Sequence, residues 1–144
     1  MTQDFSLGNL TVCVLGPQVG EEDGCEQGDW LVATAACHSG ASQVRVQEQP
    51  LLTLSDLDGF RAGLKSLISG GTGEARLDAG EAGLEVIIKP YVMGQFEMAV
   101  RISPDTSLEQ HGYTFLLDSD DLRAGIKSLD SALPVLRDAA GREK

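Results

Sequence analysis

One short motif occurs twice in this chain, and this repeat is the strongest constraint on the fold. Residues 61–67 read RAGLKSL and residues 123–129 read RAGIKSL, so the two copies differ only in Leu64 against Ile126. The same offset also matches residues upstream of the motif: Leu54, Asp56 and Asp58 with Leu116, Asp118 and Asp120. A match at one fixed offset is the signature of a repeated structural unit. We therefore expect two copies of one unit, each containing this motif.

The motif has the apolar spacing of an amphipathic helix in both copies, because side chains three and four positions apart lie on one helix face. That face contains, in the two copies, Leu57, Phe60, Leu64, Leu67 and Ile68, and Leu122, Ile126, Leu129, Leu133 and Leu136. Gly63 and Gly125 each lower helix propensity by about 1 kcal/mol. We expect each glycine to mark a close contact of its helix with the sheet or with the other helix.

The ends of the two helices are predicted from residues that cap or break helices. Ser55, with Asp58 three positions later, has the spacing of a capping box. Pro134 is expected to kink or shorten the second helix, because it lacks the backbone N–H. The second helix is predicted to begin at an acidic cluster whose carboxylates can cap its N-terminus: Asp118, Asp120 and Asp121.

Alternating apolar and polar residues predict four strands before each helix. The predicted strands are 9–15, 29–38, 41–49 and 51–54, with Pro50 as an interruption, and then 74–79, 84–89, 95–103 and 113–117. Short hairpin-like connections favour antiparallel pairing. We predict an α+β fold with mainly antiparallel sheets, built from a duplicated four-strand-plus-helix unit, with both helices packed on the apolar face. One domain is expected over 1–144, with units at about 8–70 and 73–138.

The charge balance restricts the partners of the chain. It contains 22 acidic and 11 basic residues, a formal net charge of −11, which repels nucleic acid and anionic membrane surfaces. We therefore predict a protein partner, and no nucleic acid or membrane. No apolar run approaches the roughly 20 residues of a membrane helix, and the first residues do not resemble a signal peptide. A cytoplasmic location is expected.

The residue types that usually perform chemistry do not form a recognisable catalytic or metal-binding motif. Cys13, Cys25 and Cys37 lack the close pairing of zinc ligands, and their odd number favours free thiols. Cys37 and His38 are neighbours, so on a strand they point to opposite faces. The segment 69–74 has the composition of a phosphate loop but leaves a helix C-terminus. We predict no catalytic residues, no cofactor and no metal, and hence no enzyme.

Clusters of acidic residues are the features best suited to contact a partner. Residues 16–29 are rich in glycine and carboxylates, which predicts a long acidic loop. The acidic start of the second helix is the other candidate surface. The predicted partner-binding residues are Glu21, Glu22, Asp23, Glu26, Asp118, Asp120 and Asp121.

The order of these elements is similar to that of a known family. The residues that carry the likeness are Trp30-Leu31, Leu54-Ser55-Asp56-Leu57 with Phe60, Leu64 and Leu67, Gly73-Glu74-Ala75 with Leu77, the strand 95–103, and Asp118 with Leu122, Ile126 and Leu129. Over roughly residues 28–138 the chain resembles the WapI-type bacterial immunity proteins, relatives of the antidote to a wall-associated contact-dependent toxin. The resemblance implies a protein that binds and neutralises a toxin domain, often a basic one, and carries over no catalytic residues.

Two alternatives to toxin neutralisation remain at this point. One is a structural or regulatory module that associates with itself, as a homodimer for example, through strand edges or a helix face. The other is an enzyme using a carboxylate or a thiol, which would need a pocket that holds a titratable group with a shifted pKa.

Overall fold

The structure, a computed structural model, describes residues 3–17, 30–40, 42–78, 84–103 and 111–142. Its elements are, in chain order, β1 (Gln3–Leu7), β2 (Leu10–Pro17), β3 (Trp30–Ser39), β4 (Ser42–Thr53), α1 (Leu54–Ile68), β5 (Ala75–Asp78), β6 (Leu84–Pro90), β7 (Phe96–Ile102), β8 (His111–Leu117) and α2 (Ser119–Arg142). A group of four strands followed by one helix thus occurs twice among the described residues.

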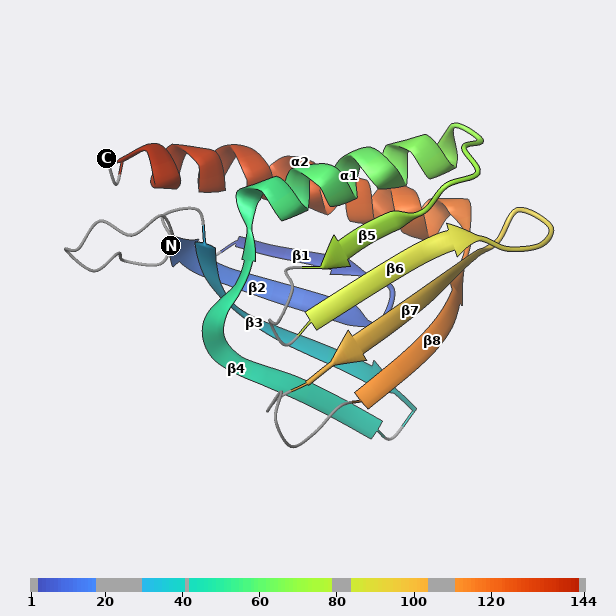
Figure 1. Cartoon of the computed structure of the whole chain (residues 1–144), viewed down its shortest axis with the longest axis horizontal. Coiled ribbons are helices and arrows are strands. Elements are labelled where there is room, and N and C mark those ends of the chain that lie inside the picture. Colours follow the sequence, from blue (N-terminus) through green and yellow to red (C-terminus); the bar gives the residue numbers. More distant parts are fainter. Residues whose placement is uncertain (1–2, 18–29, 41, 79–83, 104–110, 143–144) are drawn as a thin grey trace.

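The strands form two four-stranded antiparallel sheets, each with its strands in sequence order: β1-β2-β3-β4 and β5-β6-β7-β8. The two helices lie next to each other along one side of the sheets (Figure 1). These features confirm the predicted α+β fold class. The unit boundaries at 8–70 and 73–138 stay a prediction.

One hydrophobic core is shared by both sheets and both helices. Alternate residues of the strands point into it, and so do the apolar stripes of the helices. Its largest fully buried side chains are Phe60, Leu10, Leu31, Leu52, Leu57, Leu64, Leu77, Ile88, Met98, Ile102 and Leu122. Away from the helices, the hydroxyls of Ser42 and Tyr113 are 3.0 Å apart and link β4 to β8.

Each helix packs against the first strand of the other sheet, so α1 contacts β5 and α2 contacts β1. The two repeated glycines lie at these contacts. A Cβ atom on Gly63 would be 2.8 Å from Cα of Ala75, and one on Gly125 would be 2.6 Å from Cδ1 of Leu7. The prediction that these glycines mark close helix contacts is therefore confirmed, and the contact is with a sheet in both cases.

A hydroxyl of α2 strengthens its contact with β1. The Ser128 Oγ accepts a hydrogen bond from the Ser6 N–H at 3.3 Å and lies 3.4 Å from the Ser6 carbonyl oxygen. Since β1 is the first strand of its sheet, these groups belong to an edge that would otherwise present unpaired backbone atoms. Ser128 belongs to the repeated motif, so the motif also supplies an edge contact.

Several predicted element boundaries were wrong. The strand β1 was not predicted, although Phe5 and Leu7 alternate with exposed residues. The predicted strands 41–49 and 51–54 are a single strand, β4, which continues through Pro50. Pro50 is tolerated because β4 is an edge strand and the register of its pairing with β3 shifts there, so the missing N–H removes little pairing.

The predicted ends of the helices also need correction. The N-cap of α1 is Thr53 rather than Ser55, and the Thr53 hydroxyl and the Asp56 carboxylate each accept a backbone N–H of the other residue at 3.0 Å. The helix α2 is not shortened at Pro134 and continues to Arg142. Pro134 lies on the exposed side of α2, where water can satisfy the carbonyl that loses its helical donor.

The two glycine contacts predict different responses to the same substitution. Gly63→Ala should lower the free energy of unfolding by about 1–3 kcal/mol, because the new methyl group meets backbone that cannot move away locally. Gly125→Ala should change it by less than about 1 kcal/mol, because the helix-propensity gain offsets a small shift of the flexible Leu7 side chain. Urea denaturation of both variants measures the difference. Equal losses would contradict this account of the two contacts.

Candidate functional site

The acidic cluster at the start of α2 forms a reciprocal cap. The N–H of Asp118 donates to Oδ2 of Asp121 at 3.0 Å, and the N–H of Asp121 donates to Oδ1 of Asp118 at 2.9 Å. Asp120 is exposed and accepts a hydrogen bond from Arg123 at 3.2 Å. The predicted capping role is therefore confirmed for Asp118 and Asp121, whereas Asp120 bonds Arg123 instead. All three carboxylates lie at the N-terminal end of α2, where the helix dipole favours negative charge. Their contact with a partner stays a prediction.

The other predicted partner-binding residues, Glu21, Glu22, Asp23 and Glu26, lie outside the described residues. Their sequence still bears on the electrostatics of the chain. Residues 16–29 contain five acidic residues and no lysine or arginine. This short segment therefore supplies a large share of the net charge of −11.

The two described thiols are poor nucleophiles. Cys37 is buried, and burial raises its pKa to about 11. Cys13 lies opposite Asp4 on the neighbouring strand, and the hydrogen bond between their side chains raises the pKa of Cys13 as well. Both thiols are thus protonated at neutral pH, whereas catalysis requires the thiolate. Cys25 lies outside the described residues.

Among the described residues, no group of three or more His, Cys, Asp or Glu side chains could hold a metal ion. In the same part of the chain, no helix has the length and apolar character needed to cross a membrane.

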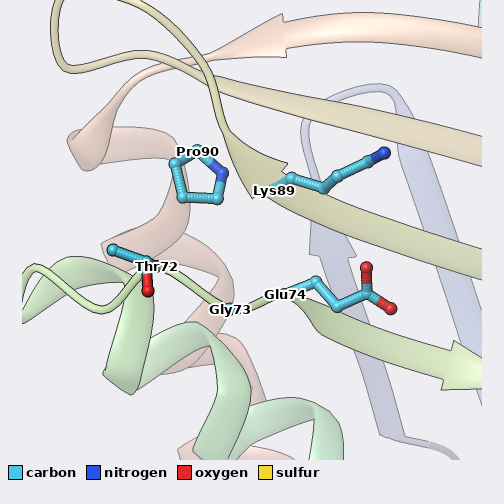
Figure 2. Close-up of a pocket in the computed structure, with 5 residues that line it drawn as sticks. All are labelled: Thr72, Gly73, Glu74, Lys89 and Pro90. Carbon is cyan, nitrogen blue, oxygen red and sulfur yellow. The ribbon is translucent and has the colours of Figure 1, made fainter.

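A shallow cleft of about 380 Å³ lies where the segment after α1 meets the end of β6. Figure 2 shows its lining residues, Thr72, Gly73, Glu74, Lys89 and Pro90. The Glu74 carboxylate is held by the Arg76 guanidinium at 3.0 Å. The cleft shows no nucleophile hydrogen-bonded to a base among these five residues, so its geometry does not favour catalysis.

A second feature near this cleft was not predicted from the sequence. The hairpin that joins β6 to β7 presents three successive apolar residues to solvent: Tyr91, Val92 and Met93 are 51%, 57% and 95% exposed. Leu116 on β8 is 52% exposed. The signal in the sequence was an apolar run directly after Pro90, at a point where a turn usually contains polar residues.

The turn of this hairpin has a defined and unusual backbone. The N–H of Gln95 donates to the Val92 carbonyl at 3.1 Å, and the N–H of Tyr91 donates to the Gln95 carbonyl at 2.8 Å. The two central residues, Met93 and Gly94, have φ angles of 56° and 78°. This is the combination of a type I′ turn, which favours Asn-Gly. A methionine there costs about 1–2 kcal/mol in backbone strain.

The chain was compared with curated proteins, solved structures and family models. No curated protein matches the chain. Two solved structures are similar over almost the whole chain: the plant transcriptional regulator PBF-2 (TM-score 0.48, 9% identity, 100% of this chain and 87% of that chain) and WHY3 from Arabidopsis thaliana (TM-score 0.45, 12% identity, 99% and 91%). At these scores the likeness supports no argument about function.

A family model gives the decisive match. The model of the immunity protein WapI-like family matches residues 4–136, which is nearly the whole of the two-sheet, two-helix fold. The chain is thus an α+β protein of the immunity class. It belongs to the WapI-like immunity protein family, and the resemblance noted in the sequence is confirmed.

The raised pKa of Cys37 predicts a loss of stability at alkaline pH. The unfolded thiol releases its proton near its ordinary pKa of 9.0, whereas the folded thiol keeps it until about 11. The free energy of unfolding should therefore fall as pH rises through this window. Denaturation of the wild type and of Cys37→Ala at pH 8, 9, 10 and 11 measures the slope. The variant should lose less stability, and parallel slopes would contradict the raised pKa.

Proposed function

We propose that this chain is a non-catalytic binding protein that neutralises a toxin domain by covering its substrate site. The observation that carries the proposal is the family match over residues 4–136. The partner is a protein, and neutralisation proceeds by steric and electrostatic blocking without turnover. The site of action is the cytoplasm.

The distribution of charge supports a basic partner. Several described carboxylates are already paired within the fold, such as Asp58 with Arg137, Asp130 with Arg61, and Glu85 with Arg101. Paired charges contribute little net field at a distance. The segment 16–29 contributes five acidic residues and no basic one, and the start of α2 contributes Asp118, Asp120 and Asp121, of which Asp120 is paired with Arg123. These two groups of carboxylates would accelerate encounter with a positively charged toxin domain.

The shared core supports steric blocking. Both sheets and both helices contribute to one packed interior, so the two halves of the chain present one joint surface. A preordered surface loses little conformational entropy on binding, which favours tight association. A tightly held protein over the substrate site needs no chemistry of its own to inhibit an enzyme.

The proposal predicts that a toxin domain is encoded beside the gene of this chain, and it is tested by expressing the chain together with that domain. Cells that express the toxin domain alone should stop growing, and cells that express both proteins should grow. The purified pair should form a complex whose affinity falls with rising salt. Continued growth arrest and no complex at low salt would remove the proposed function.

Charge removal at the proposed acidic surfaces should weaken binding without unfolding the chain. Asp118→Asn keeps a good N-cap residue, and Asp120→Asn is at an exposed side chain. Combined with glutamine or asparagine at Glu21, Glu22, Asp23 and Glu26, they should lower the association rate by about tenfold or more at low salt.

Asp130→Asn on the same helix is the control for a lost charge outside these surfaces. Stopped-flow association at several salt concentrations measures both variants, and their melting temperatures verify the fold. An unchanged rate and salt dependence in the multiple variant would exclude the acidic residues from the interface.

A further inference from the structure

We propose that the hairpin tip formed by Tyr91, Val92 and Met93 is the apolar anchor that docks the toxin domain, and that it enters an apolar pocket on that basic partner. The inference rests on the proposed function and deepens it, because it names the surface that makes the close contact. It also assigns different roles to the acidic residues and to this tip.

The composition of the tip suits a contact with a protein. Residues 90–96 read PYVMGQF and contain no charged residue, in a chain of 22 acidic and 11 basic residues. Single exposed apolar residues are common on protein surfaces, whereas contiguous exposed ones mark interaction sites. Tyrosine and methionine are also enriched in the buried centres of protein interfaces. This composition suits a surface that becomes dry on binding.

The fold does not explain why position 93 is a methionine. Its φ of 56° belongs to a turn position where asparagine or glycine is favoured, and its side chain is 95% exposed. The residue thus strains the backbone without contributing to the core. A strained residue at an exposed tip points to a role outside the fold.

Backbone hydrogen bonds hold the tip in one conformation before it binds a partner. Two backbone hydrogen bonds, at 2.8 Å and 3.1 Å, close the turn between Tyr91 and Gln95, and the strands on either side pair in register from Pro90 opposite Phe96. A fixed tip loses little conformational entropy when it enters a pocket. Hot spots of binding energy are typically such well-packed apolar side chains surrounded by polar residues.

Polar residues lie on the two strands that lead to the tip, and one further exposed apolar residue lies on the next strand, β8. On the strands that lead to it, Lys89 pairs with Glu97, and Glu97 pairs with Leu116 on β8. Leu116 is half exposed, whereas its counterpart in the repeat, Leu54, packs against the core. The position equivalent to Leu54 is thus exposed on the second sheet, where Glu97 lies between Leu116 and the hairpin.

Charge identifies the occupant as a basic protein. A second copy of the chain would bring another net charge of −11 into contact, and an anionic membrane surface would be repelled in the same way. A basic toxin domain would be attracted by the acidic segments. The uncharged tip could then be buried without removing a charge from water, a step that is unfavourable for an unpaired ion.

The test compares two substitutions at one position. Met93→Asn creates the favoured Asn-Gly turn and removes the apolar side chain, so its melting temperature should equal or exceed that of the wild type. Its affinity for the purified, catalytically inactivated toxin domain encoded beside this chain's gene should fall at least about tenfold. Met93→Leu keeps an apolar side chain on the strained backbone, so it should retain the affinity and show no gain in stability. Titration calorimetry and thermal denaturation measure both.

Each outcome decides between the alternatives. Reduced affinity of Met93→Asn with a melting temperature that is maintained or raised, and near-normal affinity of Met93→Leu, supports the anchor. Equal affinities of the wild type and Met93→Asn overturn the anchor and leave the proposed function intact. A wild-type chain that binds no toxin domain overturns both. A wild-type dimer that Met93→Asn converts to a monomer, measured by light scattering, assigns the tip to a second copy instead and overturns a toxin occupant.

Discussion

Each helix packs against the sheet formed by the other group of four strands, and the rest of the structure depends on these two contacts. Because α1 packs against β5 and α2 against β1, neither group of four strands and a helix buries its apolar residues by itself. The close approach is made at two glycines: Gly63 lies against the backbone of Ala75, which leaves no room for a side chain, and Gly125 lies against the Leu7 side chain. The chain accepts the low helix propensity of glycine there because the approach completes a core shared by both halves.

In this arrangement, the surfaces proposed for binding do not contribute to the hydrophobic core. The acidic start of α2 uses its carboxylates for capping and still presents them to water. The β6–β7 tip projects apolar side chains from the end of the second sheet. Electrostatic attraction acts over about 8 Å at physiological salt, whereas apolar contact acts only on touching surfaces. The two surfaces can therefore serve successive stages of one association.

Local patterns in the sequence predicted the presence of helices and strands better than the residues at which they begin and end. Apolar residues that recur every two, or every three to four, positions predicted both helices and seven of the eight strands in the described part of the chain. Each of these patterns reflects side chains that face the core. Pro50 misled the prediction, since the effect of a missing N–H depends on whether the strand lies at an edge. The cap at Thr53 was misplaced because Ser55 offers the same chemistry two positions later.

The sequence by itself determined the fold class, the repeated helix, the capping role of Asp118 and the family of the protein, since each depends on local spacing or on direct comparison of residues. Only the tertiary structure decided which helix covers which sheet. It also showed that Leu116 lies outside the core while Leu54 packs against it. The apolar run after Pro90 was visible in the sequence, but only the structure showed that Met93 is exposed at the tip of a hairpin. The identity of an apolar residue does not show whether it is buried. Burial depends on contacts between segments that are distant in the sequence.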